Sequence, residues 1–101
     1  MLMEVRELRY FLAVAREENI TRAAESLHIA QPSLSKQLME LEKKLGKKLL
    51  IRGKRKITLT EEGVLLRKRA EEILELVEKT QQEISSDTED VIGDIYMGGG
   101  T

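Results

Sequence analysis

Apolar residues recur at intervals of three and four through the first half of the chain, which is the spacing of an amphipathic helix. The first such run predicts a helix from about Val5 to Glu18. Its apolar face comprises Val5, Leu8, Phe11, Leu12 and Ala15. The stretch "ENIT" breaks the pattern, so we expect this helix to end there and a second element to follow.

Two further helices are predicted after this break. The second is short, and Thr21 is expected to be its N-cap because a threonine hydroxyl can accept an unpaired backbone N–H. Its inner face comprises Ala23, Ala24 and Leu27. The third helix covers "AQPSLSKQLMELEKKLG", residues 30–46, and Gly46 is expected to end it in a left-handed conformation.

The connection between the second and third helices is only three residues, "HIA". Two short helices joined so tightly must meet at a sharp angle, which is typical of a helix-turn-helix. Small Ala24 should allow close approach, while Ile29 and Leu34 fill the gap beneath. His28 is expected to adopt a positive φ, for which histidine is enriched among non-glycine residues. We favour this structural role over a catalytic or metal-binding role for the single imidazole.

After the third helix the period changes from that of a helix to that of a strand. In "KKLLIRGKRKITLT", Leu49 and Ile51 precede a turn that contains Gly53, and Ile57 and Leu59 follow it. This alternation predicts a short β-hairpin. Its tip is expected to carry four cations, Arg52, Lys54, Arg55 and Lys56.

A long helix is predicted next, with Thr60 as its N-cap and two glutamates in its first turn, which suit the helix dipole. Its apolar positions follow the rhythm of a coiled-coil-like seam. The predicted seam comprises Leu66, Ala70, Ile73, Val77, Thr80 and Ile84. A helix of roughly 25 residues spans about 38 Å, longer than so small a core can cover. We therefore favour pairing with another chain over the alternative that this face only packs on its own domain.

The remaining stretch, "SSDTEDVIGDIYMGGGT", loses the helical period. A strand is predicted from Val91 to Met97, and "GGG" is not interpreted as a phosphate-binding loop without a following helix. The predicted fold class is mainly α: a winged helix-turn-helix of three helices and a short β-hairpin wing, followed by a long dimerisation helix. We divide the chain into a winged domain at 1–59, a linker helix at 60–87 and a hinge into a truncated second domain at 88–101.

Composition narrows the function classes. The 101 residues include no cysteine, which excludes disulfides, thiolate metal sites and thiol nucleophiles. Charged residues interrupt the N-terminal apolar run, and no apolar run is of membrane length. We expect a soluble, cytoplasmic protein.

Charge is distributed unevenly along the chain, although the formal net charge is only −1. Residues 31–60 hold nine basic and two acidic side chains, whereas residues 61–90 hold four basic and ten acidic ones. A basic block followed by an acidic helix indicates a polyanion-binding surface beside a solvated stalk.

The third helix supplies the clearest candidate for that surface. At 100° per residue its four leucines share one side. The other side carries Pro32, Lys36, Met39 and Lys43, flanked by Ser33 and Ser35. Small polar residues at the N-terminal end allow close approach to base edges, and Lys36 can reach guanine or phosphate. We expect Met39 to pack at the rim of this face. The lysines expected to serve solubility are Lys43, Lys44, Lys47 and Lys48.

The amino-acid sequence of residues 4–63 resembles the N-terminal region of LysR-type transcriptional regulators along its full length. The most specific pieces are "AA-x-x-LHIAQPSLS", "LE-x-x-LG" and "LT-x-x-G". Lys36 stands where the family more usually has arginine, and Leu50 where it often has phenylalanine. Lysine cannot form the planar two-pronged contact that arginine gives to guanine.

The resemblance implies a role for each matching residue. It assigns contacts with DNA bases to Gln31, Pro32, Ser33, Ser35 and Lys36. Contacts with the DNA backbone are expected from Thr21, Arg22, Arg52, Lys54, Arg55 and Lys56. It also implies antiparallel pairing of two linker helices in a homodimer, and tetramers at full length. "GDIYMGGGT" looks like the entry to an effector-binding domain, where a small-molecule effector is expected; no cofactor is expected within residues 1–101.

Three function classes follow from these features. The leading interpretation is a sequence-specific DNA-binding regulator that acts as a dimer on a partly palindromic operator. A protein-binding winged helix would expose an apolar patch on the third helix, whose outward side is instead polar and basic. The interpretation as an enzyme fragment is the weakest of the three, because no carboxylate pair, activated nucleophile or metal cluster is evident in the sequence. RNA binding is less favoured because two tyrosines and one phenylalanine provide no stacking platform.

Overall fold

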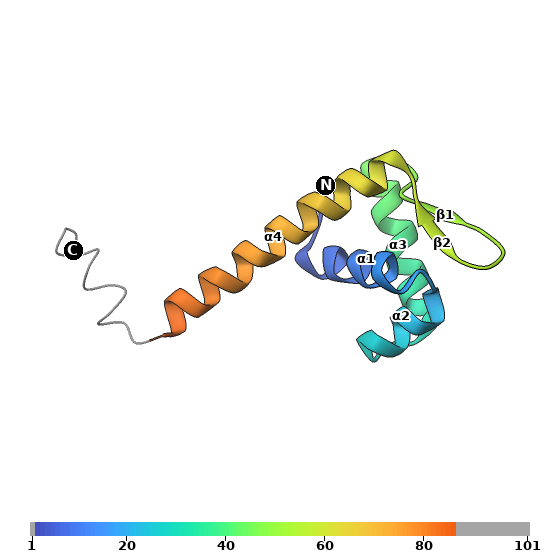
Figure 1. Ribbon diagram of the computed structural model, residues 1–101. Helices are drawn as coiled ribbons and strands as arrows, with labels where there is room; N and C mark the ends of the chain where they lie inside the picture. The colour runs from blue at the N-terminus through green and yellow to red at the C-terminus, as the bar shows by residue number, and fades with distance from the viewer. Residues whose placement is uncertain (1, 87–101) are drawn as a thin grey trace.

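The computed structural model describes residues 2–86 of the chain. The elements run in the order α1 (Val5–Glu17), α2 (Ile20–Leu27), α3 (Gln31–Leu45), β1 (Leu50–Arg52), β2 (Ile57–Leu59) and α4 (Glu61–Ser85). The three short helices pack together, the hairpin projects from one side, and α4 runs away from them (Figure 1). The predicted fold class is confirmed. The strand from Val91 to Met97 and the hinge into a second domain at 88–101 lie outside the described residues.

One apolar core joins the three short helices to the base of the hairpin. Phe11 and Val14 of α1 have no exposed surface, and neither has Leu34 of α3. The buried cluster comprises Phe11, Ala13, Val14, Ala23, Ala24, Leu34, Leu38, Leu41, Leu49, Leu50 and Ile57. Half-buried Ile29 packs against it, as predicted for the turn between α2 and α3.

The junction between α1 and α2 differs from the prediction in one detail. Glu18 ends α1 with a φ of 57°, and Asn19 is the N-cap of α2 because its side chain accepts the N–H of Arg22 at 2.8 Å. Thr21, the predicted N-cap, lies inside the first turn of α2. The prediction was wrong because asparagine and threonine are both good caps and stand two positions apart.

The ends of α2 and α3 are closed in the same way. His28 has a φ of 61°, and Ile29 N donates to Ala24 O at 3.0 Å, which completes a Schellman-type end. Gly46 has a φ of 69° at the end of α3. Both left-handed residues were predicted and are confirmed.

The hairpin is antiparallel and short, and Leu50 pairs with Leu59. Leu49 and Leu50 are both buried, whereas Ile51 is 51% exposed, so the predicted alternation of Leu49 and Ile51 was wrong. The chain leaves α3 with two successive leucines in the core because Leu49 precedes the first strand residue and is not yet part of the pleat. Arg52, predicted at the tip, is the last residue of β1 and pairs with Ile57.

A buried carboxylate ties the start of α1 to the end of α3. Lys44 Nζ donates to Glu7 Oε2 at 2.8 Å and to Leu2 O at 3.1 Å, while Glu4 N donates to Glu7 Oε1 at 2.8 Å. Burial raises the pKa of Glu7, but the hydrogen bonds from Lys44 and Glu4 and the charges of Lys44 and Arg6 outweigh it. The pKa of Glu7 is therefore below its ordinary value, and the carboxylate stays ionised at neutral pH.

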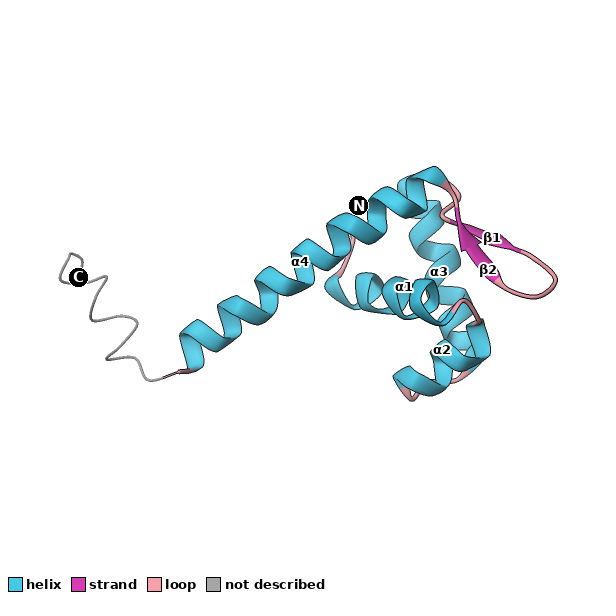
Figure 2. Ribbon diagram, in the orientation of Figure 1, coloured by secondary structure: helices cyan, strands magenta, loops and turns pink. Residues whose placement is uncertain are grey.

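The start of α4 is packed directly on the chain that leads from α3 into the hairpin. Thr60 caps α4 by accepting Gly63 N at 3.0 Å, as predicted, and its hydroxyl donates to Lys48 O at 2.7 Å. A Cβ at Gly63 would collide with the carbonyl oxygen of Leu49. The "LT-x-x-G" motif therefore supplies a cap and a close backbone approach. From this anchor α4 extends over 25 residues, well past the short helices (Figure 2).

Replacing Gly63 with alanine is expected to lower the free energy of unfolding by about 1–3 kcal/mol, because the backbone of Leu49 must move to make room. Urea denaturation followed by circular dichroism measures this. Val64→Ala is the matched control, since Val64 is the next residue of α4 and is 47% exposed. Equal stability of the two variants would contradict the close approach.

Candidate nucleic-acid interface

The helix α3 has one buried side and one open side. Leu34, Leu38 and Leu41 lie in the core, whereas Leu45, the last of the four leucines, is 40% exposed. The open side carries the residues predicted to contact bases. Four of them are exposed and Ser35 is half-buried: Gln31, Pro32, Ser33 and Lys36 complete the set.

The N-terminus of α3 is left open toward solvent. Ala30 is its N-cap and has no side chain to accept a backbone N–H, and Pro32 occupies the first turn. The helix dipole therefore places partial positive charge at a surface that no side chain of the cap covers. The tight end of α2 at His28 fixes where this N-terminus points.

Most of the residues predicted to contact the DNA backbone gather around one hollow. This hollow, of about 250 Å³, lies between the start of α2 and the hairpin. The predicted residues that line it are Thr21, Arg52, Lys54, Arg55 and Lys56. Asn19 lines it as well and was missed by the sequence analysis; its signal was its place as the cap before α2. Arg22 is exposed on α2 but does not line the hollow.

The cations of this surface take part in none of the ion pairs formed within the described residues. Among residues 2–86, the ion pairs are Arg6 with Glu4, Arg16 with Glu17, Lys44 with Glu7 and Arg69 with Glu72. None of them involves Lys36 or a cation of the hairpin. In this part of the chain the hairpin cations are free of ion pairs, although Glu18 lines the same hollow.

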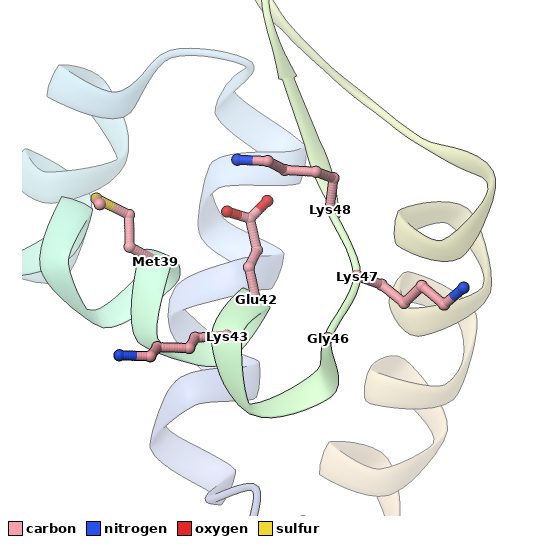
Figure 3. Close-up of a pocket in the computed structure, with 6 residues that line it drawn as sticks. All are labelled: Met39, Glu42, Lys43, Gly46, Lys47 and Lys48. Carbon is pink, nitrogen blue, oxygen red and sulfur yellow. The ribbon is translucent and has the colours of Figure 1, made fainter.

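The open side of α3 continues toward its C-terminus. A second hollow, of about 480 Å³, is lined by Pro32, Ser35, Lys36, Met39, Glu40 and Lys43. Met39 is 61% exposed, so the expectation that it packs at the rim was wrong. The leucine one position earlier, Leu38, takes the core position and turns Met39 outward. Met39 and Lys43 also line a third hollow, of about 390 Å³, with Lys47 and Lys48 (Figure 3).

Glu42 connects α3 to the hairpin through a buried carboxylate. Its Oε2 accepts Leu49 N at 2.8 Å and Leu50 N at 3.2 Å. Figure 3 shows the Glu42 side chain pointing from α3 toward the segment that carries Lys48. The second end of the hairpin is anchored too, because Ile57 N donates to Glu18 O at 2.9 Å. The open side of α3 and the hairpin are thus held in one fixed relation.

The predicted seam of α4 is only partly open. Ala70 is fully buried and Leu66 packs against the core of its own chain, so the structure contradicts an exposed seam at these two positions. The helix α4 packs against α1, which covers that side. Val77 is half-buried, while Ile73, Thr80 and Ile84 are exposed.

An exposed apolar stripe lies on a neighbouring side of α4. Its members fall within an arc of about 100° at the helical angle per residue. We name this the α4 stripe, which comprises Leu65, Ile73, Leu76 and Ile84. Leu65 and Leu76 were missed because the heptad-like rhythm does not show which side of the helix the chain's own domain covers.

The described residues carry no metal-binding cluster. Within residues 2–86, no group of three or more histidine, cysteine, aspartate or glutamate side chains is placed to hold an ion. No helix in this part of the chain combines the length and apolar character needed to cross a membrane.

The chain is similar in sequence to known bacterial regulators. The family model described as "Bacterial regulatory helix-turn-helix protein, lysR family" matches residues 5–64. The chain is 47% identical over 97 residues to the HTH-type transcriptional regulator BsdA of Bacillus subtilis (strain 168), covering 95% of the chain and 33% of that protein. It is 52% identical over 79 residues to the Hca operon transcriptional activator HcaR of Escherichia coli (strain K12), covering 78% of the chain and 27% of that protein.

A solved structure shows the same fold. The crystal structure of the BenM DBD/benA site 1 DNA complex matches with a TM-score of 0.77 and 45% sequence identity, covering 79% of the chain and 93% of that chain. The chain spans about a third or less of the length of BsdA and HcaR.

Replacing Glu42 with alanine should destabilise the link between α3 and the hairpin, because the N–H groups of Leu49 and Leu50 lose their buried acceptor. We expect a loss of about 1–3 kcal/mol in the free energy of unfolding and faster hydrogen exchange at these two amides. Glu42→Gln retains a carbonyl acceptor and serves as the matched control. Unchanged exchange in the alanine variant would contradict the proposed link.

Proposed function

The chain belongs to the lysR family of bacterial regulatory helix-turn-helix proteins, and from that premise we propose that it is the N-terminal DNA-binding part of a transcriptional regulator. It binds a partly palindromic operator as a dimer. The observation that carries this proposal is the open polar side of α3 beside the hairpin, whose cations take part in no ion pair within residues 2–86. The relatives BsdA and HcaR are described as a transcriptional regulator and a transcriptional activator.

Direct recognition of bases is assigned to α3. A major groove about 12 Å wide admits an α-helix, and small side chains let the helix approach base edges. We assign base contacts to Gln31, Pro32, Ser33, Ser35 and Lys36, all on the open side or first turn of α3. The lysine offers a single-point contact to guanine or phosphate, unlike the forked contact of an arginine.

Contacts with phosphates are assigned to the residues around the hollow between α2 and the hairpin. Thr21 and the hairpin cations line it together, which supports one continuous path for a DNA backbone. Arg22 is exposed on the same helix, α2, and is assigned to the same strand of backbone. The hairpin acts as the wing, on the backbone or in the minor groove beside the α3 footprint.

We assign dimerisation to α4. Exposed apolar side chains along a helix that extends past its own domain favour a second copy as their cover, since one winged domain contacts too few base pairs for specificity. We propose that effector binding belongs to a further domain, as relatives of about three times the matched length would allow. A catalytic role is not proposed. A cytoplasmic location follows from the proposed role on bacterial DNA.

The test is selection of bound duplexes from a random DNA pool by the 101-residue chain. The proposal expects enrichment of a two-fold-symmetric motif. Retention of DNA without any enriched motif would contradict sequence-specific recognition. No retention at low salt would contradict DNA binding as such.

A Lys54→Ala/Arg55→Ala variant should show a weaker dependence of affinity on salt. Each phosphate contact that is lost reduces the slope of log affinity against log salt by about 0.9. Fluorescence anisotropy across a salt series measures the slope. Lys68→Ala/Lys79→Ala removes the same charge from exposed positions of α4 and should leave the slope unchanged. Identical slopes for both double variants would exclude the hairpin from the interface.

An Ile73→Asp/Leu76→Asp variant should sediment as a monomer, because dimerisation would bury two charges that have no partner. It should lose affinity for a duplex with two half-sites and keep its affinity for a single half-site. Val64→Asp places a charge at an exposed apolar position of α4 outside the α4 stripe and should remain dimeric. A dimeric double variant would show that the pairing surface lies elsewhere.

A further inference from the structure

Two apolar side chains, Pro32 and Met39, line the hollow on the open side of α3. Met39 is the larger of them. It is 61% exposed, although Leu34 and Leu38 of the same helix are almost completely buried. An isolated exposed apolar residue is common on protein surfaces and needs no explanation by itself. The position of Met39 relative to the base-contacting residues is what gives it meaning.

Met39 continues the stripe of residues that faces the proposed DNA. Pro32, Ser35, Lys36 and Met39 follow one another at intervals of three, one and three, and all four line the same hollow. At 1.5 Å per residue, Met39 lies about 10 Å along the axis from Pro32, which is within the major-groove width of about 12 Å. Lys43, about 16 Å along the axis, reaches beyond that width to the phosphates.

The chemistry of the major groove offers one apolar group at the edge of a base pair, the C5-methyl group of thymine. Methionine suits that partner because its unbranched thioether chain is flexible and polarizable. Cations stand on both sides of it, with Lys36 toward the N-terminus and Lys43 toward the C-terminus of α3, and they outnumber Glu40, the one acidic residue that lines the same hollow. This charge favours a polyanion over an apolar protein surface as the partner of the stripe.

We propose that Met39 is a specificity-determining residue that contacts the methyl group of a thymine in each half-site. The inference rests on the proposed function of α3 and adds to it a base preference that the polar residues do not supply. Removal of a buried methyl group weakens an apolar contact by about fourfold in affinity. Recognition of thymine at one position should therefore depend on that methyl group.

The experiment uses the duplex selected from the random pool and the 101-residue chain. Each thymine is replaced in turn by uracil, in both half-sites together, which removes the methyl group and keeps base pairing. Affinities are measured for the native chain, for Met39→Ala and for Met3→Ala. Met3, 38% exposed before α1, is the matched control for loss of an exposed methionine.

The proposal expects one thymine position at which uracil weakens the native chain and Met3→Ala by about fourfold per half-site. Met39→Ala should bind the thymine and uracil duplexes equally at that position while keeping the native circular dichroism spectrum. If no position distinguishes Met39→Ala from the native chain, the role of Met39 is overturned and the proposed function stands. If the chain retains no duplex, both are overturned.

Discussion

The carboxylate of Glu42 is the constraint on which the arrangement of the proposed DNA-binding surface depends. It accepts the N–H groups of Leu49 and Leu50 at the point where the chain leaves α3 for the hairpin. The same short segment is held from the other side, since Thr60 N donates to Leu49 O and the Thr60 hydroxyl donates to Lys48 O. Three elements, α3, the hairpin and α4, therefore meet around residues 48–50. In the proposed function this junction sets how the recognition helix, the wing and the dimerisation helix are placed relative to one another.

This junction gives a physical meaning to two of the sequence motifs. In "LE-x-x-LG" the glutamate is the buried acceptor, and the glycine takes the left-handed conformation that ends α3. In "LT-x-x-G" the threonine caps α4, and the glycine lets α4 approach the backbone of Leu49. Both motifs act on the same few residues between α3 and the hairpin, although they are separated in the sequence.

The helices and their ends could be predicted because they depend on local chemistry. The left-handed His28 and Gly46, and the cap at Thr60, follow from side chains within a few residues of each position. The predictions were wrong where two neighbouring residues could serve as the same helix cap, or where packing between distant segments determines which side of a helix is buried. Asn19 and Thr21 both suit a cap, and only the observed hydrogen bond selects Asn19. Ala70 belongs to an apolar rhythm in the sequence, but only the packing of α4 on α1 shows that its own domain covers it.

Most residues of the candidate site could be predicted from the sequence, but their arrangement in space could not. The polar side of α3 follows from the helical period, and the cations of the hairpin follow from the charge distribution. Their convergence with Thr21 and Asn19 around one hollow depends on the hydrogen bond between Ile57 and Glu18, which joins segments far apart in the sequence. The exposure of Met39 likewise depends on which neighbouring residue takes the core position.

The most direct measurement is a crystal structure of the chain bound to its selected duplex. The account predicts α3 in the major groove with Ser35 and Lys36 facing base edges, the hairpin tip on the flanking backbone, and the hydrogen bonds from Leu49 and Leu50 to Glu42 retained. An α3 that lies outside the groove, or a hairpin that has separated from α3 to reach the DNA, would contradict it.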